Sequence, residues 1–308
     1  MLLEQQYREL CSGAYGLVER DVPLSKYTTF QIGGPVDVFI EPTSEKELVR
    51  SIRYLRAEQI PFYLMGNGSN LLVRDGGLRG AVIHLGKHYS DVVINGNSIR
   101  AQAGASLASI AKMSFRASLT GMEALSGIPG SVGGAAAMNA GAYNAEMKDV
   151  VSAVRVINRE GEITTLRREE MDFSYRHSRV QSEDLIVSEV YFELMPGEAQ
   201  EIEAAYRDYT ARRTSKQPLE KASAGSTFKR PAGGYASALI DNAGLRGYSV
   251  GAAQVSEKHC GFLVNNGGAS ASQILELIDY VSKEVERRFG IRLEPEVRII
   301  GEDRRNEP

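Results

Sequence analysis

The sequence predicts a mixed α and β protein of about two domains, or three small ones. The chain has 308 residues, and about 150 residues is a usual domain size. In the first third, strand patterns alternate with helix patterns: a strand candidate over 36–40 precedes an apolar helix face formed by Leu48, Ile52 and Leu55. A heavily charged helix is expected over 198–213 and is typical of a connector, so we place a domain boundary near 195–215.

Capping patterns support two of the predicted helices. Ser44 and Glu47 match a capping box before the first helix. Ser270 and Gln273 resemble a second box before a strong helix over 271–289, and Gly290 stands where a left-handed C-cap belongs. Further helices are expected over 106–119 and near 235–242. Strands are expected over 62–65, 82–85, 92–94, 99–103, 185–194 and 292–300, with a hairpin joining 151–157 to 163–166.

Composition excludes several classes of protein. Lys and Arg total 36 against 39 Asp and Glu, a net charge of −3, so a dedicated nucleic-acid binder is not expected. The two cysteines, Cys11 and Cys260, form no disulfide framework, which fits a reducing cytosol. We expect Cys260 to be buried and inert, and we expect His84 and His88 to lie at the surface. No zinc spacing, signal peptide or membrane span is recognised, so neither a metal nor a membrane is predicted.

Two glycine-rich segments predict an anion site. The first follows a strand, and the second precedes a short predicted helix. Clustered glycines let backbone N–H groups approach an anion, and a helix N-terminus favours phosphate. Neither segment fits G-x-G-x-x-G or the P-loop. Two such loops therefore suggest a diphosphate held by a different fold, although each could be only a tight turn. Their candidate ligand-binding residues are Gly66, Asn67, Gly68, Ser69 and Asn70 in the first, and Gly127, Gly130, Ser131, Gly133 and Gly134 in the second.

Three polar residues outside these loops could carry chemistry. Ser226 lies beside Gly225 with Lys229 and Arg230 close behind, which suits an anionic substrate or a proton transfer. Arg176 follows Tyr175 and could clamp a carboxylate. Glu296 belongs to the last predicted strand. The alternatives are a serine in a glycine turn, a solvated arginine and a strand with paired surface charges.

Taken in order, these motifs resemble the bacterial UDP-N-acetylenolpyruvylglucosamine reductase family, flavoenzymes of peptidoglycan precursor synthesis. The resemblance covers about residues 20–301. Its motifs are T-T-F-Q-I-G-G at 28–34, G-N-G-S-N at 66–70, G-I-P-G-S-V-G-G at 127–134, N-A-G-A-Y at 139–143, Y-R-H-S at 175–178, A-G-S-T-F-K-R-P at 224–231 and E-P-E-V-R at 294–298. The run before Ser226 departs from the family pattern. The short interval after Ser178 is similar to the form of the family without an inserted tyrosine loop.

The resemblance implies an α+β fold: an FAD-binding fold of the vanillyl-alcohol-oxidase type with two α+β subdomains (1–85 and 86–205), and a C-terminal α+β substrate-binding domain (206–308). By motif match, the two glycine loops hold FAD, together with Asn139 and Gly141. Ser226, Arg176 and Glu296 fall on the family's active-site residues. We assign substrate contacts to Tyr175, Lys229, Arg230, Arg246 and His259.

The implied activity is a cytoplasmic oxidoreductase step of cell-wall biogenesis, which bears on cell shape and cell division. NADPH reduces FAD, and the UDP-N-acetylglucosamine enolpyruvate is then reduced to UDP-N-acetylmuramate. Arg176 and a protonated Glu296, its pKa raised by burial, stabilise an enediolate, and Ser226 donates the proton. Two alternatives stay open. A related flavin oxidase would use oxygen, although the first loop lacks the histidine that often binds FAD covalently. A non-catalytic nucleotide-sugar binding module would need no flavin.

Overall fold

The computed structural model describes residues 2–304, which divide into two compact units. The first contains the chain up to Arg20, Val38–Asn67 and Gly80–Arg213. The second contains Asp21–Asp37, Gly68–Arg79 and the chain from Thr214 onward. The chain passes between the units within strands β1 (Leu17–Pro23), β2 (Pro35–Glu41) and β5 (Leu78–His84). Neither unit is therefore one continuous stretch of sequence.

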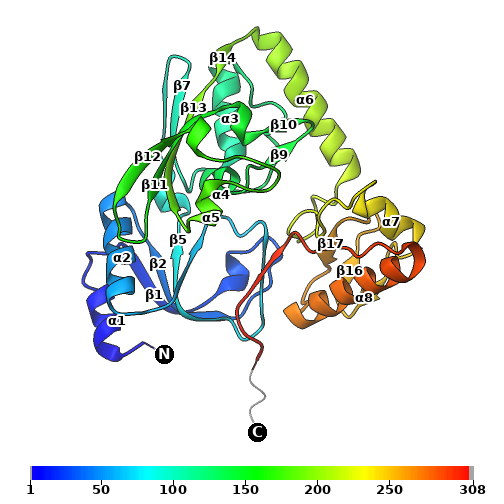
Figure 1. Ribbon diagram of the computed structural model, residues 1–308, viewed down its shortest axis with the longest axis horizontal. Helices are drawn as coiled ribbons and strands as arrows, with labels where there is room; N and C mark the ends of the chain where they lie inside the picture. The colour runs from blue at the N-terminus through cyan, green and yellow to red at the C-terminus, as the bar shows by residue number, and fades with distance from the viewer. Residues whose placement is uncertain (1, 305–308) are drawn as a thin grey trace. The chain divides into compact units, whose positions relative to one another are not determined.

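A four-stranded sheet is built early in the chain. Its strand order is β1-β2-β5-β3, with β3 (Phe62–Met65) parallel to β5. Helix α2 (Glu45–Ala57) lies beside this sheet (Figure 1) and buries Leu48, Ile52 and Leu55 completely, as the apolar spacing predicts. The predicted capping box is only half formed. Ser44 Oγ accepts the N–H of Glu47 at 3.3 Å, but the Glu47 carboxylate accepts the N–H of Thr43 instead of Ser44.

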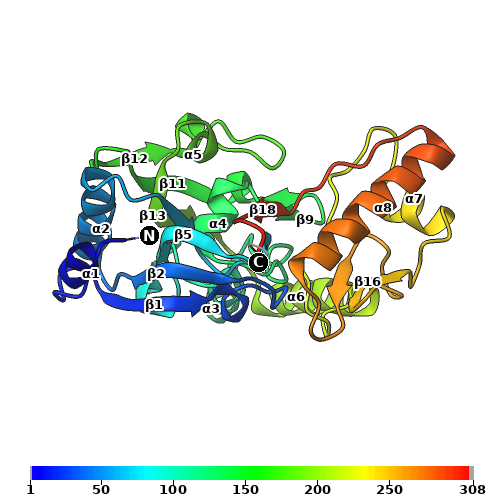
Figure 2. The same cartoon turned by 90° about the horizontal axis from the view of Figure 1, so that it is seen from below.

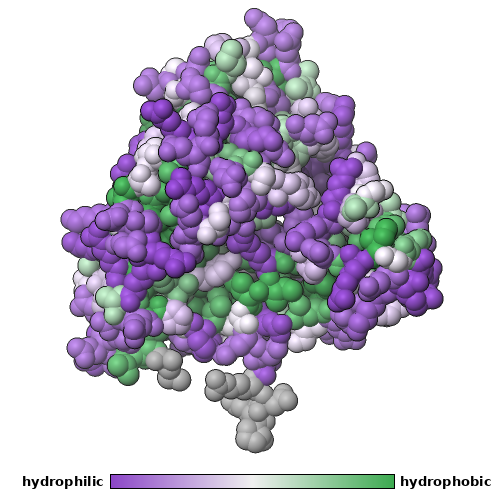
Figure 3. Space-filling model, in the orientation of Figure 1, coloured by the Kyte–Doolittle hydropathy of each residue, from purple (hydrophilic) through white to green (hydrophobic). Residues whose placement is uncertain are grey.

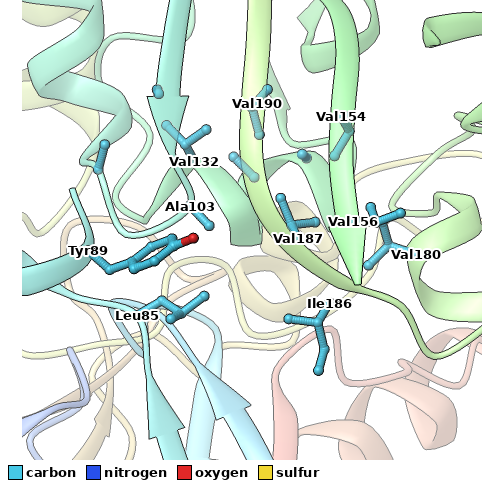
Figure 4. Close-up of a cluster of buried hydrophobic side chains, with 14 of the residues drawn as sticks. Leu85, Tyr89, Ala103, Val132, Val154, Val156, Val180, Ile186, Val187 and Val190 are labelled. Carbon is cyan, nitrogen blue, oxygen red and sulfur yellow. The ribbon is translucent and has the colours of Figure 1, made fainter. Parts of the chain in front are cut away.

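The first unit also contains a five-stranded antiparallel sheet of order β12-β11-β13-β7-β6. The predicted hairpin is confirmed as β11 (Val151–Ile157) and β12 (Ile163–Arg167), in which Val154 faces Leu166. Valines of β11 and β13 form a buried cluster with Val132 of α4 (Figure 4). The first unit's remaining α-helices and strands are α1 (Glu4–Leu10), β6 (Val92–Asn95), β7 (Ser98–Gln102), α3 (Leu107–Arg116), β8 (Leu119–Thr120), α4 (Val132–Ala137), β9 (Gly141–Ala142), β10 (Ala145–Glu146), α5 (Arg179–Ser182), β13 (Ile186–Glu193), β14 (Met195–Pro196) and α6 (Ala199–Lys216), whose last turn enters the second unit.

The second unit has its own core. Strands β15 (Ser249–Val250), β16 (Ala253–Val255) and β17 (Leu263–Asn265) form an antiparallel sheet. Helices α7 (Ala236–Asn242) and α8 (Ala271–Phe289) lie side by side and share buried apolar residues (Figure 2). The second capping box is complete: Ser270 and Gln273 each bind the other's backbone N–H, and Gly290 ends α8 at φ +68°.

The predicted last strand is correct only at its end. Strand β18 (Arg298–Ile300) pairs in parallel with β4 (Leu71–Val73), whereas 292–297 is not a strand. Pro295 has no N–H group to donate to a ladder. The segment instead makes separate backbone bonds, from Lys229 N–H to the Glu294 carbonyl and from Glu296 N–H to the Thr227 carbonyl, both at 2.8 Å. These bonds give residues 294–296 fixed neighbours in the absence of a regular strand.

Hydrophilic residues predominate on the face drawn in Figure 3. Several of the large hydrophobic side chains that are exposed are tyrosines, including Tyr143, Tyr175, Tyr235, Tyr248 and Tyr280. Among the described residues, no helix combines the length and the apolar character needed to cross a bilayer. The same residues contain no group of three or more His, Cys, Asp or Glu side chains suited to a metal ion.

Candidate active site

The first glycine loop connects β3 to β4 and crosses the division of the chain. Gly66 and Asn67 belong to the first unit, and Gly68, Ser69 and Asn70 belong to the second. Gly68 adopts φ +58°, a backbone conformation that favours glycine. Asn67 and Ser69 are half-buried, and no side chain or backbone group of the described residues hydrogen-bonds their side chains. Both polar side chains are therefore available to a ligand.

The second glycine loop packs tightly against other backbone. Gly130 adopts φ +146°, and a Cβ on Gly133 would lie 2.7 Å from the Cβ of Ala103. The N–H groups of Val132 and Gly133 donate to the carbonyls of Ala105 and Ala103, each at 2.8 Å. Ser131 caps α4 by accepting the N–H of Gly134. These three N–H groups have acceptors within the protein, so a phosphate at the start of α4 would have to replace those bonds.

The two glycine loops meet at Gly66 and Ser131. A Cβ on Gly66 would overlap the Oγ of Ser131, so the approach requires glycine at this position. This contact brings together two loops that are about 60 residues apart in the sequence. The two loops are therefore in direct contact within the first unit, while their binding of a diphosphate stays a prediction.

A buried histidine supports the first loop, and the sequence analysis missed it. His84, predicted to lie at the surface, is 8% exposed, and its Nδ1 lies 2.9 Å from Glu41 Oε1. The ring also hydrogen-bonds the backbone of Gly66. Burial lowers the pKa of His84, against the opposing effect of Glu41. A pattern could have indicated this role, because His84 ends an apolar strand, whereas His88 is exposed as predicted.

Arg176 stands at the tip of a tight turn in the first unit. Ser174 and His177 exchange backbone hydrogen bonds of 3.1 and 3.2 Å, which leaves Tyr175 and Arg176 between them. Arg176 adopts φ +56°, and its guanidinium lies 5.3 Å from the centre of the exposed Tyr175 ring. Tyr175 and Arg176 are adjacent in the sequence, but the sequence did not predict the strained turn on which they lie.

Asn139 holds this turn in place. It is 1% exposed, and its amide nitrogen donates to Ser174 O and to Glu146 Oε2, both at 3.0 Å. Its amide oxygen accepts the N–H of Lys148. Both amide hydrogens are therefore used inside the protein, which favours a positioning role over the predicted cofactor contact. Gly141 is required by close packing, since a Cβ there would lie 2.7 Å from the carbonyl oxygen of Ala145.

Ser226 and Glu296 come together in the second unit. Glu296 N–H donates to the carbonyl of Thr227, the residue next to Ser226. Thr227 N–H donates to the Gly261 carbonyl at 2.8 Å, and Ser226 forms a β-bridge with Phe262. Gly225 supports the bend at φ +77°. Ser226 is exposed and Glu296 is half-buried, so both side chains can reach a ligand.

Two basic residues after Ser226 are held by neighbours. Lys229 Nζ lies 3.0 Å from Glu294 Oε2, and the Arg230 guanidinium lies 4.2 Å from the centre of the Tyr235 ring. Both side chains are exposed. Both interactions lie at the surface, so replacing the protein partner with a substrate oxygen costs little free energy.

Arg246 and His259 have stronger internal roles. Arg246 binds Asp241 through two hydrogen bonds, of 3.0 and 2.6 Å, and also binds the Glu257 carbonyl. His259 Nδ1 accepts the N–H of Gly261 at 3.2 Å, beside the Gly261 carbonyl that binds Thr227. Burial lowers the pKa of His259. Cys260 is buried as predicted, and burial raises the pKa of its thiol to about 11, so it is an unreactive thiol.

A half-buried cation, Arg213, lies at the second glycine loop. A Cβ on Gly127 would lie 2.7 Å from Cδ and 2.9 Å from Nη1 of Arg213, so this arginine crosses the loop where Gly127 has no side chain. Arg213 Nε is buried and without a hydrogen-bond partner among the described residues. The charged pattern over 198–213 predicts a connector and does not indicate this contact of Arg213.

The chain matches two protein-family models. Residues 36–167 match the FAD binding domain, and residues 217–300 match the C-terminal domain of UDP-N-acetylenolpyruvoylglucosamine reductase. The predicted α+β fold with an FAD-binding part and a C-terminal domain is confirmed.

Curated relatives extend the match to nearly the whole chain. The UDP-N-acetylenolpyruvoylglucosamine reductase of Caldanaerobacter subterraneus subsp. tengcongensis is 49% identical over 91% of this chain and 92% of its own length. The chain belongs to the UDP-N-acetylenolpyruvoylglucosamine reductase family. A reductase from Clostridium botulinum strain Alaska E43 is 45% identical over 97% of this chain and 99% of its own. The crystal structure of the Thermus caldophilus reductase matches with a TM-score of 0.79 and 36% identity, over 92% of this chain and 98% of that one.

The residues of the first unit fit an FAD of this family. The cofactor is anionic, and the glycine loops offer it the unpartnered side chain of Asn67 and the unpaired Arg213, beside positions where any side chain would clash. Asn67 and the loop backbone would hold it, and Gly66 and Ser131 would fix the loops around it.

Proposed function

We propose that this chain reduces UDP-N-acetylglucosamine enolpyruvate to UDP-N-acetylmuramate with NADPH, as an FAD-dependent oxidoreductase of peptidoglycan precursor synthesis in the cytoplasm. The family match over more than nine-tenths of the chain supports the reaction. The FAD-binding domain supports the cofactor. The chemistry that bound FAD supplies is hydride transfer, from NADPH to the terminal carbon of the enolpyruvyl group.

The catalytic roles are carried by one observation in the second unit, the backbone bond between Thr227 and Glu296. It places the main chain of Glu296 beside that of Thr227, the residue that follows the serine we propose as proton donor. When hydride adds to the terminal carbon of the enolpyruvyl group, negative charge develops on the adjacent carbon and on the carboxylate attached to it, and fixed donors stabilise such charge. Glu296, half-buried beside Thr227, is the second residue that we assign to this site. Ser226 then gives its proton to the adjacent carbon, and solvent restores the proton.

In the first unit, Arg176 is our candidate for binding a substrate carboxylate. Its guanidinium offers two parallel N–H groups, which match a carboxylate. The turn formed by Ser174–His177 and anchored by Asn139 orients it. Lys229 and Arg230 are the candidates for the diphosphate of the substrate, because their present partners are exposed.

The test is the visible absorbance of the purified protein, recorded anaerobically in three steps: alone, after NADPH, and after the enolpyruvyl substrate. A flavin spectrum that bleaches with NADPH and returns with the substrate is expected. Bleaching that only oxygen reverses would favour a flavin oxidase. No flavin, even after incubation with FAD, would leave a nucleotide-sugar binding module.

A further inference from the structure

The buried His84 connects three strand ends beneath the first glycine loop. His84 is the last residue of β5, Glu41 is the last residue of β2, and Gly66 directly follows β3. In the sheet, β2 and β3 are the two neighbours of β5. The His84 ring bonds to both sides, through Nδ1 to Glu41 Oε1 at 2.9 Å and by a further hydrogen bond to the backbone of Gly66. All three residues belong to the first unit, so the ring joins the start of the loop to the sheet of that unit.

Packing holds this ring in one place. A Cβ on Gly86 would overlap the Cε1 of His84, so the ring lies directly over a position that has no side chain. The ring of Phe39 lies 5.2 Å away, between ring centres. Among the described residues, the titratable groups that face His84 are Glu41 on β2 and His88 just after β5. A ring fixed by packing and hydrogen bonds is suited to orient a neighbouring group.

The bond to Gly66 sets the direction of the peptide between Gly66 and Asn67. This bond favours the protonated ring, so the ring donates it and the Gly66 carbonyl accepts it. In a trans peptide, the carbonyl and the following N–H point to opposite sides. The N–H of Asn67 therefore points away from His84, and no described residue accepts it. The ring thus keeps one N–H of the loop directed toward a ligand.

The two bonds of His84 need one proton more than a neutral ring beside a carboxylate contains. A neutral imidazole has a single N–H, but Nδ1 faces Glu41, which leaves Nε2 to serve Gly66. Both bonds form together when an imidazolium faces the Glu41 carboxylate, or when a protonated Glu41 donates to Nδ1. Burial lowers the pKa of His84, so the flavin-free protein holds this proton weakly. An anion bound at the Asn67 N–H stabilises nearby positive charge and so favours the proton.

We propose that His84 and Glu41 form a proton-sharing positioning pair, which directs the Asn67 N–H to the diphosphate of FAD. The inference rests on the proposed function, which supplies FAD as the anion. Binding of FAD and binding of the proton then favour each other. The pKa of His84 lies below its usual value of about 6.5 without FAD and is raised when FAD is bound, so the affinity for FAD falls as the pH rises between these two values.

The experiment uses the full chain freed of flavin. Binding of FAD, ADP and riboflavin is titrated at pH 6, 7 and 8, and the flavin-free melting temperature of each variant is recorded. His84→Phe keeps a ring but removes both nitrogens, whereas His84→Gln keeps an amide that can donate to Gly66. Glu41→Gln removes the charge that favours the protonated ring. His88→Gln is the matched control, because His88 is an exposed histidine four residues away.

For His84→Phe at pH 7 we expect dissociation constants of FAD and ADP that are raised on the order of 10-fold. Riboflavin should bind as it does to wild type, because it has no phosphate. His84→Gln should recover part of the FAD affinity but lose its pH dependence. Glu41→Gln should shift that dependence to lower pH. His88→Gln should bind all three ligands as wild type does at pH 7.

Wild-type FAD affinity in His84→Phe would overturn the proposal. An equal loss of riboflavin binding would also overturn it, since that result indicates a general loosening of the fold. Should His84→Phe not fold, His84→Gln decides, and a pH dependence of FAD binding identical to that of wild type overturns the proposal. A wild-type chain that binds no FAD would overturn the proposed function together with this inference. If wild type binds FAD and turns over, an unaltered His84 variant overturns this inference alone.

Discussion

The side-chain amide of Asn70 donates a hydrogen bond of 3.3 Å to the main-chain carbonyl of Glu296. The N–H of Arg298 returns a bond of 3.0 Å to the Asn70 carbonyl. The end of the first glycine loop is thus joined to the segment that carries a proposed catalytic carboxyl. Within the second unit, a loop proposed to contact the cofactor also positions a residue proposed to act on the substrate.

Replacing Asn70 with Ala should disturb Glu296 more than it disturbs the cofactor. The loss of one hydrogen bond should lower the free energy of unfolding by about 1 kcal/mol. FAD content should stay near wild type, while reoxidation of the reduced flavin by substrate should slow several-fold. Rapid-mixing absorbance separates the two half-reactions. Equal slowing of both would show that Asn70 does not act through Glu296.

The Ser226→Ala variant should keep flavin reduction by NADPH and lose turnover. Removing a positioned proton donor typically costs 10²- to 10⁴-fold in rate, so we expect a loss on the order of 10³-fold. Ser249→Ala is a suitable control, because Ser249 is an exposed serine of the same unit. Turnover by Ser226→Ala at more than a tenth of the wild-type rate would rule out the proton-donor role.

For Arg176→Lys we expect a slower second half-reaction with unchanged reduction by NADPH. Lys keeps the charge but cannot form two parallel hydrogen bonds with a carboxylate. The rate should fall about 10- to 100-fold, consistent with a loss of 1.5 to 3 kcal/mol for one charged hydrogen bond. The control is Arg179→Lys, since Arg179 is paired with Glu183 near the same turn. If flavin reduction falls as much as turnover, Arg176 does not act at the substrate carboxylate.

A methyl group on Gly66 should force the two glycine loops apart. The new Cβ would overlap Ser131 Oγ, and overpacking usually costs about 1–3 kcal/mol. We expect Gly66→Ala to lower both the melting temperature and the FAD content of the purified protein. Combining it with Ser131→Ala removes the overlapping atom, so the double variant should be more stable than the sum of the single changes predicts. If the stability effects of the two single changes simply add in the double variant, the contact between Gly66 and Ser131 does not limit how closely the loops approach.

The buried pair of His84 and Glu41 should make stability fall in mild acid. Burial lowers the pKa of His84 in the folded protein, so between that value and the unfolded value of about 6.5 the unfolded chain binds more protons. Stability is therefore retained above about pH 6.5 and lost as the pH falls below it, by at most about 1.4 kcal/mol per pH unit from this group. Urea unfolding between pH 5 and 8 measures this.

His84→Asn should reduce the pH dependence of stability, although His259 adds a dependence of the same sign. The matched variant His88→Asn changes an exposed histidine four residues away and should behave as wild type. An unaltered slope in His84→Asn would exclude His84 as the source.

The sequence alone determined the family, the glycine loops and most elements. These features depend on residues that are close in the sequence. Helices α2 and α8 each contain their own apolar stripe and cap, and Gly68 and Gly225 lie at bends formed by a few consecutive residues. The strand expected over 292–300 was too long, because Pro295 ends the ladder and a few tertiary backbone bonds replace it.

Tertiary structure alone decided which groups were left free for ligands. His84 is buried because Glu41 from another strand provides its partner, and no spacing within the sequence shows that pairing. The N–H groups at the start of α4 are used up by carbonyls of a segment about 30 residues earlier. The packing of Arg213 against Gly127 arises only when α6 reaches the second glycine loop, and no spacing in the sequence shows it. A sequence shows what each residue can bond, whereas the fold determines which of those bonds have already been made.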